Sequence, residues 1–168
     1  MICAGVDPGV AGALAVINEV GDLDTIAMPT MGDPRMVDGA AVARWLGDRD
    51  VEMAIIEQAH AMPRQGVASS FNFGRTYGQL LGVLQCSLIP YRAVTPQRWK
   101  KDLHLSPDKE QSRRMAIETF PRFAEQFVLK KDEARAEAAL IAWWWLHGRT
   151  ASEQHTRVLA RKKEQSEE

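Results

Sequence analysis

The pattern of hydrophobic and polar positions begins with short apolar runs and continues with longer amphipathic segments. Three apolar runs near the N-terminus are separated by Pro8-Gly9 and Gly21-Asp22, pairs typical of tight turns, which predicts an antiparallel meander. Two further apolar runs are set apart by helical segments. The five predicted strands are residues 2–7, 12–17, 23–28, 53–56 and 88–94.

Apolar residues at helical spacing predict four helices. Asp38 can cap the first of them, and Pro121 stops the third. The predicted helices are residues 38–47, 69–85, 108–120 and 132–147, with loops at 28–38 and 60–68. A meander followed by helix-crossed parallel strands predicts an α/β fold, in which helices flank a five-stranded mixed sheet on both faces.

The chain is long enough for one domain with a full core, since 45% of its 168 residues are hydrophobic. We expect a folded domain at residues 1–148 and a charged, flexible tail at 149–168. The only cysteines are Cys3 and Cys86, which makes a disulfide framework unexpected. No apolar stretch reaches the roughly 18 residues of a membrane span, and no signal peptide is evident. These features predict a cytoplasmic protein that does not associate with membranes.

Charge is distributed unevenly along the chain, although the net charge is only -1. Residues 1–60 contain 3 basic and 10 acidic residues (net -7), whereas residues 61–135 contain 13 basic and 7 acidic residues (net +6). Such asymmetry is typical of one basic face that binds nucleic acid, or simply of an uneven solvated surface. Arg98, Lys100, Lys101, Arg113 and Arg114 are the candidates for phosphate contacts on such a face.

Acidic residues end two of the predicted strands. Asp7 follows the first apolar run, and Glu57 follows the fourth. If these strands are parallel neighbours, both acids project at the carboxyl edge of the sheet, where α/β proteins bind their ligands. A charge at the end of a buried strand needs a partner, so each acid either binds a cation or caps its own turn.

A third acidic cluster lies at the start of the last helix. Glu137 shares a helical face with Leu140, Ile141 and Trp144, so a carboxylate on this core-facing stripe requires a cation or an arginine. Asp132 can turn toward the sheet from the helix start, or it can be an ordinary N-cap. Glu133, four residues before Glu137, could also reach inward.

Four acids from two strand ends and one helix suit two Mg²⁺ or Mn²⁺ ions held by carboxylates and water. Such a pair of ions promotes phosphodiester hydrolysis. Ordinary caps and ion pairs are the alternative explanation for the same four residues.

Five motifs in this order resemble the RuvC-type Holliday-junction resolvases of the ribonuclease H-like superfamily. Two are short, Gly-Val-Asp-Pro-Gly at 5–9 and Ile-Glu-Gln at 56–58. The other three, at residues 94–100, 109–114 and 130–138, resemble the phage and plant-chloroplast branch. The resemblance covers about residues 2–147. Because no transit peptide is evident, a bacterial or phage-infected cell is the expected setting.

The resemblance implies a homodimeric, metal-dependent endonuclease that nicks two opposed strands of four-way junction DNA, an intermediate of recombination and repair. By position, Asp7, Glu57, Asp132 and Glu137 would hold the metals, and Lys109 would lie near the scissile phosphate. Ala134 occupies the position three residues before Glu137, where bacterial RuvC usually has an acid. The choice between Asp132 and Glu133 therefore stays open.

Two further features bear on assembly and on the junction. Gly74, Gly78 and Gly82 form a stripe on one helix, which either packs on the protein's own sheet or lies at a dimer interface. The loop with Arg64 and Gln65 matches the region that enters the junction centre in RuvC-type enzymes. Phe71 and Phe73, just after it, are expected in the core rather than as wedges between bases.

The alternatives to a junction resolvase are a ribonuclease H-like nuclease on other branched DNA or RNA/DNA hybrids, and a junction-binding protein without activity. An ATP-binding fragment of the sugar-kinase type is disfavoured, because the chain lacks a second phosphate-binding glycine motif and the length for two lobes. The sequence does not identify a helicase partner or a preferred cleavage sequence.

Overall fold

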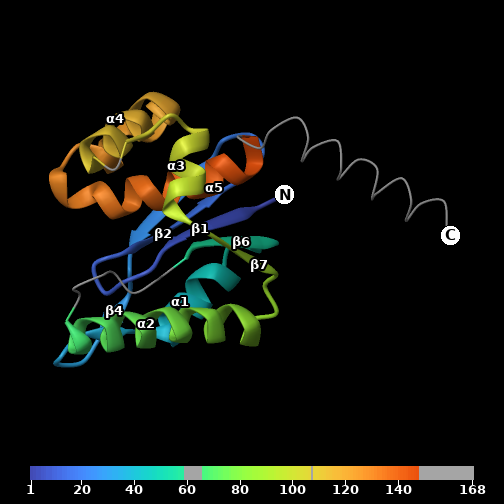
Figure 1. The fold of residues 1–168 in the computed structure, drawn as a ribbon. Helices are drawn as coiled ribbons and strands as arrows, with labels where there is room; N and C mark the ends of the chain where they lie inside the picture. The colour runs from blue at the N-terminus through green and yellow to red at the C-terminus, as the bar shows by residue number, and fades with distance from the viewer. Residues whose placement is uncertain (59–65, 107, 148–168) are drawn as a thin grey trace, which may run out of the picture.

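A five-stranded mixed sheet separates two layers of helices (Figure 1). The structure is a computed structural model that describes residues 1–58, 66–106 and 108–147. The strands lie in the order β3-β2-β1-β6-β7, which confirms the predicted mixed α/β sheet. Their bounds are Cys3–Asp7 (β1), Ala13–Ile17 (β2), Leu23–Ala27 (β3), Met53–Glu57 (β6) and Tyr91–Val94 (β7).

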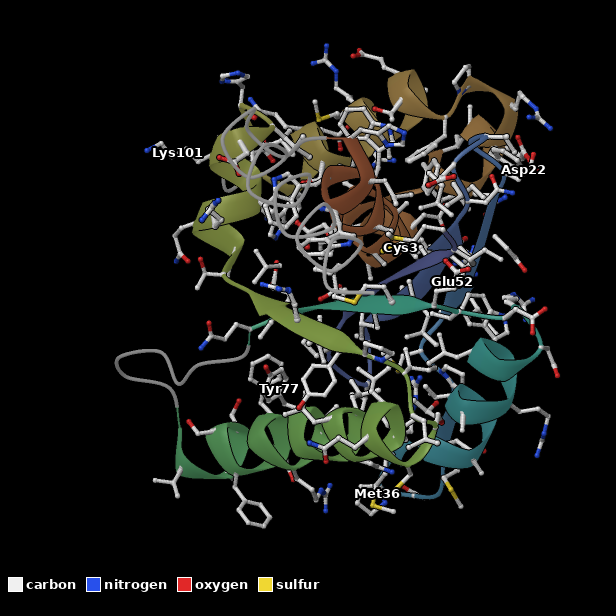
Figure 2. All side chains as sticks on the ribbon, turned by 90° about the vertical axis from the view of Figure 1, so that its right-hand side faces the viewer. Cys3, Asp22, Met36, Glu52, Tyr77 and Lys101 are labelled. Atoms are coloured by element: carbon white, nitrogen blue, oxygen red, sulfur yellow. The ribbon has the colours of Figure 1, made fainter. Side chains whose placement is uncertain are left out.

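Helices cover both faces of this sheet, as the alternating pattern predicts. One layer contains α1 and α2, and the opposite layer contains α3, α4 and α5 (Figure 1). In Figure 2, Cys3 lies on the α5 side of the sheet and Tyr77 on the α2 side. The bounds are Gly39–Gly47 (α1), Val67–Cys86 (α2), Pro96–Asp102 (α3), Lys109–Thr119 (α4) and Glu133–His147 (α5). Two 3-10 turns, Pro121–Phe127 (η1) and Lys130–Asp132 (η2), join α4 to α5.

The central strands place the two strand-end acids side by side. β1 pairs with β6 in parallel, and Val6 is opposite Ile56, so Asp7 and Glu57 end neighbouring strands at the same level. Side chains alternate between the faces of a strand. Because Val6 and Ile56 point into the α1–α2 layer, Asp7 and Glu57 belong to the face that α5 covers.

Gly5 sets how closely α5 approaches that face. A Cβ atom at Gly5 would lie 2.0 Å from the Ala138 carbonyl oxygen and 2.8 Å from the Ala142 backbone nitrogen. Only a residue without a side chain allows this approach of helix backbone to strand. The contact involves Ala138, the residue after Glu137, so it holds the turn of α5 that carries Glu137 against the middle of β1.

The helix α3 and the hairpin of β4 (Thr30–Met31) with β5 (Met36–Val37) are not predicted from the sequence. The hairpin lies inside the predicted loop at 28–38. The predicted Asp38 cap is confirmed, because its side chain accepts from the Ala41 backbone N–H, and Asp108 caps α4 in the same way. The predicted tail at 149–168 lies outside the described residues.

The prediction that Phe71 belongs to the core is wrong, since 68% of its surface is exposed, whereas Phe73 is half-buried. Of the three consecutive tryptophans at 143–145, Trp143 is partly exposed and the other two are buried, because neighbours on a helix diverge by about 100°. Within the described ranges, no helix is long and apolar enough to cross a membrane.

Candidate active site

Glu57 ends β6 and is held from the side by a buried indole. Its Oε2 atom accepts a hydrogen bond of 2.8 Å from Nε1–H of Trp99, a residue of α3 whose surface is fully buried. Glu57 and Asp7 are both half-buried. The strand-end prediction is therefore confirmed as to place, with both carboxylates at the carboxyl edge of the sheet and on its α5 side.

Glu137 lies in the first turns of α5 and is 5% exposed. Its Oε1 atom accepts hydrogen bonds from Lys100 Nζ at 2.6 Å and from Ser112 Oγ at 3.3 Å. The prediction that a carboxylate on this apolar stripe requires a cationic partner is confirmed, and that partner is Lys100. Ser112, fully buried in α4, is a contact that sequence reasoning missed.

Asp132 has the role of a local cap. Its Oδ2 atom accepts a hydrogen bond of 3.0 Å from the Leu129 backbone N–H, and its Oδ1 atom lies 3.6 Å from Nη1 of Arg135. It is 4% exposed, so these contacts satisfy a buried charge. Glu133 begins α5 and is half-buried. Asp132 therefore closes the η2 turn from its third position, with Leu129 as the N-cap, and does not cap α5 as the N-cap explanation supposed; its role as a metal ligand stays a prediction.

The four predicted ligands do not form a closed cluster in this structure. Among residues 1–58, 66–106 and 108–147, no three Asp, Glu, His or Cys side chains lie close enough together to hold an ion. Two of the acids are bound to other groups of the chain. The Glu137 carboxylate is paired with the Lys100 ammonium, and the Asp132 carboxylate accepts a hydrogen bond from the backbone of the turn before α5. Carboxylate oxygens are nevertheless the ligands that Mg²⁺ prefers, so the donor types of Asp7, Glu57 and Glu137 fit such an ion.

The basic residues predicted to contact phosphates have different environments. Lys100 is buried in the site against Glu137, with only 14% of its side chain exposed. Lys101 and Arg114 are exposed, and Lys101 lies on the outer side of α3 (Figure 2). Arg98 is about half exposed and forms an ion pair of 3.3 Å with Asp102.

Arg113 is engaged within the fold, so its predicted phosphate contact has no support here and stays a prediction. Its Nη1 atom donates to the backbone oxygens of Phe127 and Val128, and its Nη2 atom binds both carboxylate oxygens of Glu110. The Glu110 carboxylate raises the pKa of the Arg113 guanidinium above its ordinary value. With 12% of its side chain exposed, Arg113 clamps the chain before η2 and does not present its charge to solvent.

Three of the predicted site residues cannot be placed by their side chains. Lys109 is the first residue of α4, and its side chain lies outside the described residues. Arg64 and Gln65 fall in the undescribed segment 59–65. Their roles stay predictions.

The glycine stripe of α2 faces away from the sheet. A Cβ atom at Gly74, Gly78 or Gly82 would meet no other atom within 4 Å. The buried residues of this helix are instead Thr76, Leu80 and Leu84. This geometry excludes the explanation that the stripe packs on the protein's own sheet.

No protein-family model matches the chain, and no curated protein sequence matches it. Solved structures do match. RuvC of T. thermophilus in complex with a Holliday junction substrate superposes with a TM-score of 0.63 at 19% identity, covering 84% of this chain and 90% of that one. The chain has the fold of RuvC-type resolvases.

Two other resolvases share this RuvC-type fold with the chain. The yeast mitochondrial Holliday junction resolvase Ydc2 has a TM-score of 0.54 at 16% identity, over 95% of this chain and 85% of that one. The Fowlpox virus resolvase, solved with substrate Holliday junction DNA, has a TM-score of 0.54 at 15% identity, over 88% of this chain and 99% of that one. At these identities the likeness establishes the fold, and function has to be argued from the residues of the site.

Proposed function

We propose that this protein is a homodimeric endonuclease that resolves four-way DNA junctions by metal-dependent phosphodiester hydrolysis. The observation that carries the proposal is the placement of Asp7 and Glu57 at the ends of neighbouring parallel strands, beneath the helix that contributes buried Glu137. This placement occurs in a fold shared with three kinds of Holliday junction resolvase.

Two Mg²⁺ or Mn²⁺ ions per site would be held by four acids, as the sequence predicts: Asp7, Glu57, Asp132 and Glu137. Bound there, the metal would activate a water and stabilise the leaving oxygen of the phosphodiester. The chain's own residues position the acids. From α3, Trp99 binds the Glu57 carboxylate and Lys100 binds the Glu137 carboxylate, and Gly5 allows α5 to lie close to β1.

Lys100 balances the charge of Glu137 before any ion is bound. Its ammonium group lies 2.6 Å from Glu137 and is largely shielded from water. A cation held this close lowers the cost of burying the carboxylate. A divalent ion bound to Glu137 would compensate the charge of this carboxylate instead. The Lys100 ammonium would then be available to bind the anionic DNA substrate.

Substrate recognition is inferred from the neighbours and from the charges on this chain. The T. thermophilus and Fowlpox virus proteins are described in complex with Holliday junction DNA. In this chain, exposed Lys101 and Arg114, with half-exposed Arg98, belong to α3 and α4 in the layer that also contains α5. Contacts of this type bind phosphate without reading sequence.

Assembly as a homodimer is part of the proposal, because paired nicking needs two active sites in a fixed relation. One face of α2 carries Val67, Phe71, Gly74 and Gly78 at helical spacing. Val67 is 88% exposed and Phe71 is 68% exposed, and the glycines beside them are open. An exposed apolar patch next to a flat stripe fits a symmetric contact between two copies of the helix.

Incubation of the protein with a synthetic four-way junction and Mg²⁺, beside a linear duplex of the same arm sequence and an RNA/DNA hybrid, tests this proposal. We expect cuts in two opposed strands of the junction, ligatable nicks, and no product in EDTA. Glu57→Gln should bind the junction without cutting it. Preferential cutting of the hybrid would replace the proposal by a ribonuclease H activity, and binding without cutting under any metal would support the non-catalytic alternative.

A further inference from the structure

Trp99 is the largest fully buried side chain among the described residues, and its one polar side-chain atom is directed at a candidate catalytic acid. The indole belongs to α3 and packs in the core that α4 and α5 form with the sheet. Nε1–H donates to Oε2 of Glu57 at 2.8 Å. A buried indole N–H requires an acceptor, and a hydrogen bond to an ionised carboxylate is stronger than one to a neutral group.

The next residue along the helix holds a different acid. Lys100 Nζ binds Glu137 of α5, while Trp99 binds Glu57 of β6, so two consecutive side chains connect α3 to two carboxylates from separate elements. The Lys100 ammonium also lies 5.2 Å from the centre of the Trp99 ring. Through these contacts α3 determines the relative positions of Glu57 and Glu137.

The helix that carries both side chains is itself tied to β6. It follows β7, in which Val94 is opposite Glu57 in the sheet. Thr95 caps the helix by accepting from the Arg98 backbone N–H, and Pro96 occupies the first turn, where its fixed φ is favourable. A cap and a proline at this point leave α3 little freedom to rotate its side chains away from the acids.

We propose that Trp99 is a positioning residue that fixes the orientation of the Glu57 carboxylate for the cleavage reaction. The inference rests on the proposed nuclease function and assigns to this indole N–H a role beyond filling the core. Groups that hold a metal-binding or catalytic carboxylate through one hydrogen bond typically contribute about 10–100-fold to metal affinity or activity.

A second indole in the same layer supplies a matched control. Trp144 of α5 is 4% exposed, and its Nε1–H donates to Oδ2 of Asp102 at 3.0 Å. Trp144→Phe therefore removes a buried indole-to-carboxylate hydrogen bond of the same kind as Trp99→Phe does, but from an acid outside the candidate site. Both variants keep an aromatic ring and lose similar volume.

The first experiment compares the two variants in single-turnover junction cleavage at saturating protein, with junction affinity measured separately in EDTA. We expect Trp99→Phe to cut roughly 10–100-fold more slowly at unchanged affinity, and Trp144→Phe to cut at the wild-type rate. Benzothienylalanine at position 99, which replaces N–H by sulfur and keeps the ring size, should reproduce the loss. Wild-type cleavage by this isostere, or equal slowing in both phenylalanine variants, would overturn the proposal.

The second experiment does not depend on cleavage. In ¹H–¹⁵N spectra of the metal-free protein, Glu57→Gln should shift the indole resonance of Trp99 and leave that of Trp144 in place. Without DNA, Mn²⁺ should bind Trp99→Phe about 10–100-fold more weakly than it binds the wild type. Electron paramagnetic resonance of the free ion measures this affinity. If the wild type cut no junction, the proposed function would fail while these measurements still decided the role of Trp99. An unmoved Trp99 resonance or an unchanged Mn²⁺ affinity would refute that role.

Discussion

Replacing Lys100 by methionine should destabilise the protein, because Glu137 would then be buried without its cation. The pair is 2.6 Å apart, and the two side chains are 14% and 6% exposed. Removal of one partner from a buried ion pair costs about 3–5 kcal/mol. At about 2–4 °C per kcal/mol for a domain of this size, the melting temperature should fall by roughly 6–20 °C.

A double variant separates the charge effect from packing. Lys100→Met combined with Glu137→Gln removes both charges, so it should recover much of the stability that the single variant loses. Lys101→Met is the matched control, since Lys101 is exposed on the outer side of α3 and should leave stability within about 0.5 kcal/mol of wild type. Urea unfolding in EDTA, followed by tryptophan fluorescence, gives all four free energies.

Metal addition extends the same experiment to the candidate site. Mn²⁺ should stabilise Lys100→Met more than wild type, since the ion meets Glu137 without a competing ammonium group. A ligand at 100 times its dissociation constant stabilises by about 2.7 kcal/mol. Wild-type stability of Lys100→Met, or a double variant no more stable than the single one, would refute the importance of the pair. An absence of Mn²⁺ stabilisation in Lys100→Met would count against Glu137 as a ligand.

Five further variants test the fold, the assembly and the chemistry. Gly5→Ala forces a Cβ atom to within 2.0 Å of a backbone oxygen of α5, so it should lower the unfolding free energy by about 3 kcal/mol or more. Gly47→Ala, in α1 and away from the proposed dimer face, adds a Cβ atom with open space around it, so it should be neutral or stabilising by up to about 1 kcal/mol in denaturant titrations. Gly78→Leu should convert a dimer to a folded monomer in sedimentation, and a wild-type monomer would reject the assembly proposal. Asp7→Asn should abolish cleavage and keep junction binding in gel-shift assays; full activity would move the ligand role elsewhere. Lys109→Ala should lower the single-turnover rate far more than affinity, and equal losses would make this lysine a backbone contact only.

The sheet and most helices could be predicted because their signals are local. Turn pairs such as Pro8-Gly9 and caps such as Asp38 mark where elements begin and end, and both act within a few residues. The helix α3 was missed because Trp99 is its only buried apolar residue, which leaves no helical periodicity. Thr95 followed by Pro96 was the available signal, a capping residue before a proline at the first helical position.

The sequence predicts the acidic residues of the candidate site better than it predicts the residues that bind them. Glu137 was identifiable because a charge on an apolar helix stripe must be compensated. Its partner Lys100 is 37 residues away in sequence, so only the folded structure shows that this lysine serves the site. The contacts of Arg113 within the fold were not predictable for the same reason, since its acceptors on Phe127 and Val128 are 14 and 15 residues distant. Long-range contacts decide whether a basic residue meets solvent, and spacing does not report them.

The most direct test of the central claim is cleavage of a cruciform extruded from a supercoiled plasmid in the presence of Mg²⁺. Two cuts made within the lifetime of one complex give linear plasmid, whereas a single cut relaxes the supercoil, reabsorbs the cruciform and leaves a nicked circle. A dimeric junction resolvase should give mainly linear plasmid, with nicks placed symmetrically across the junction. Nicked circles alone, or an intact plasmid under conditions in which an RNA/DNA hybrid is cut, would contradict it.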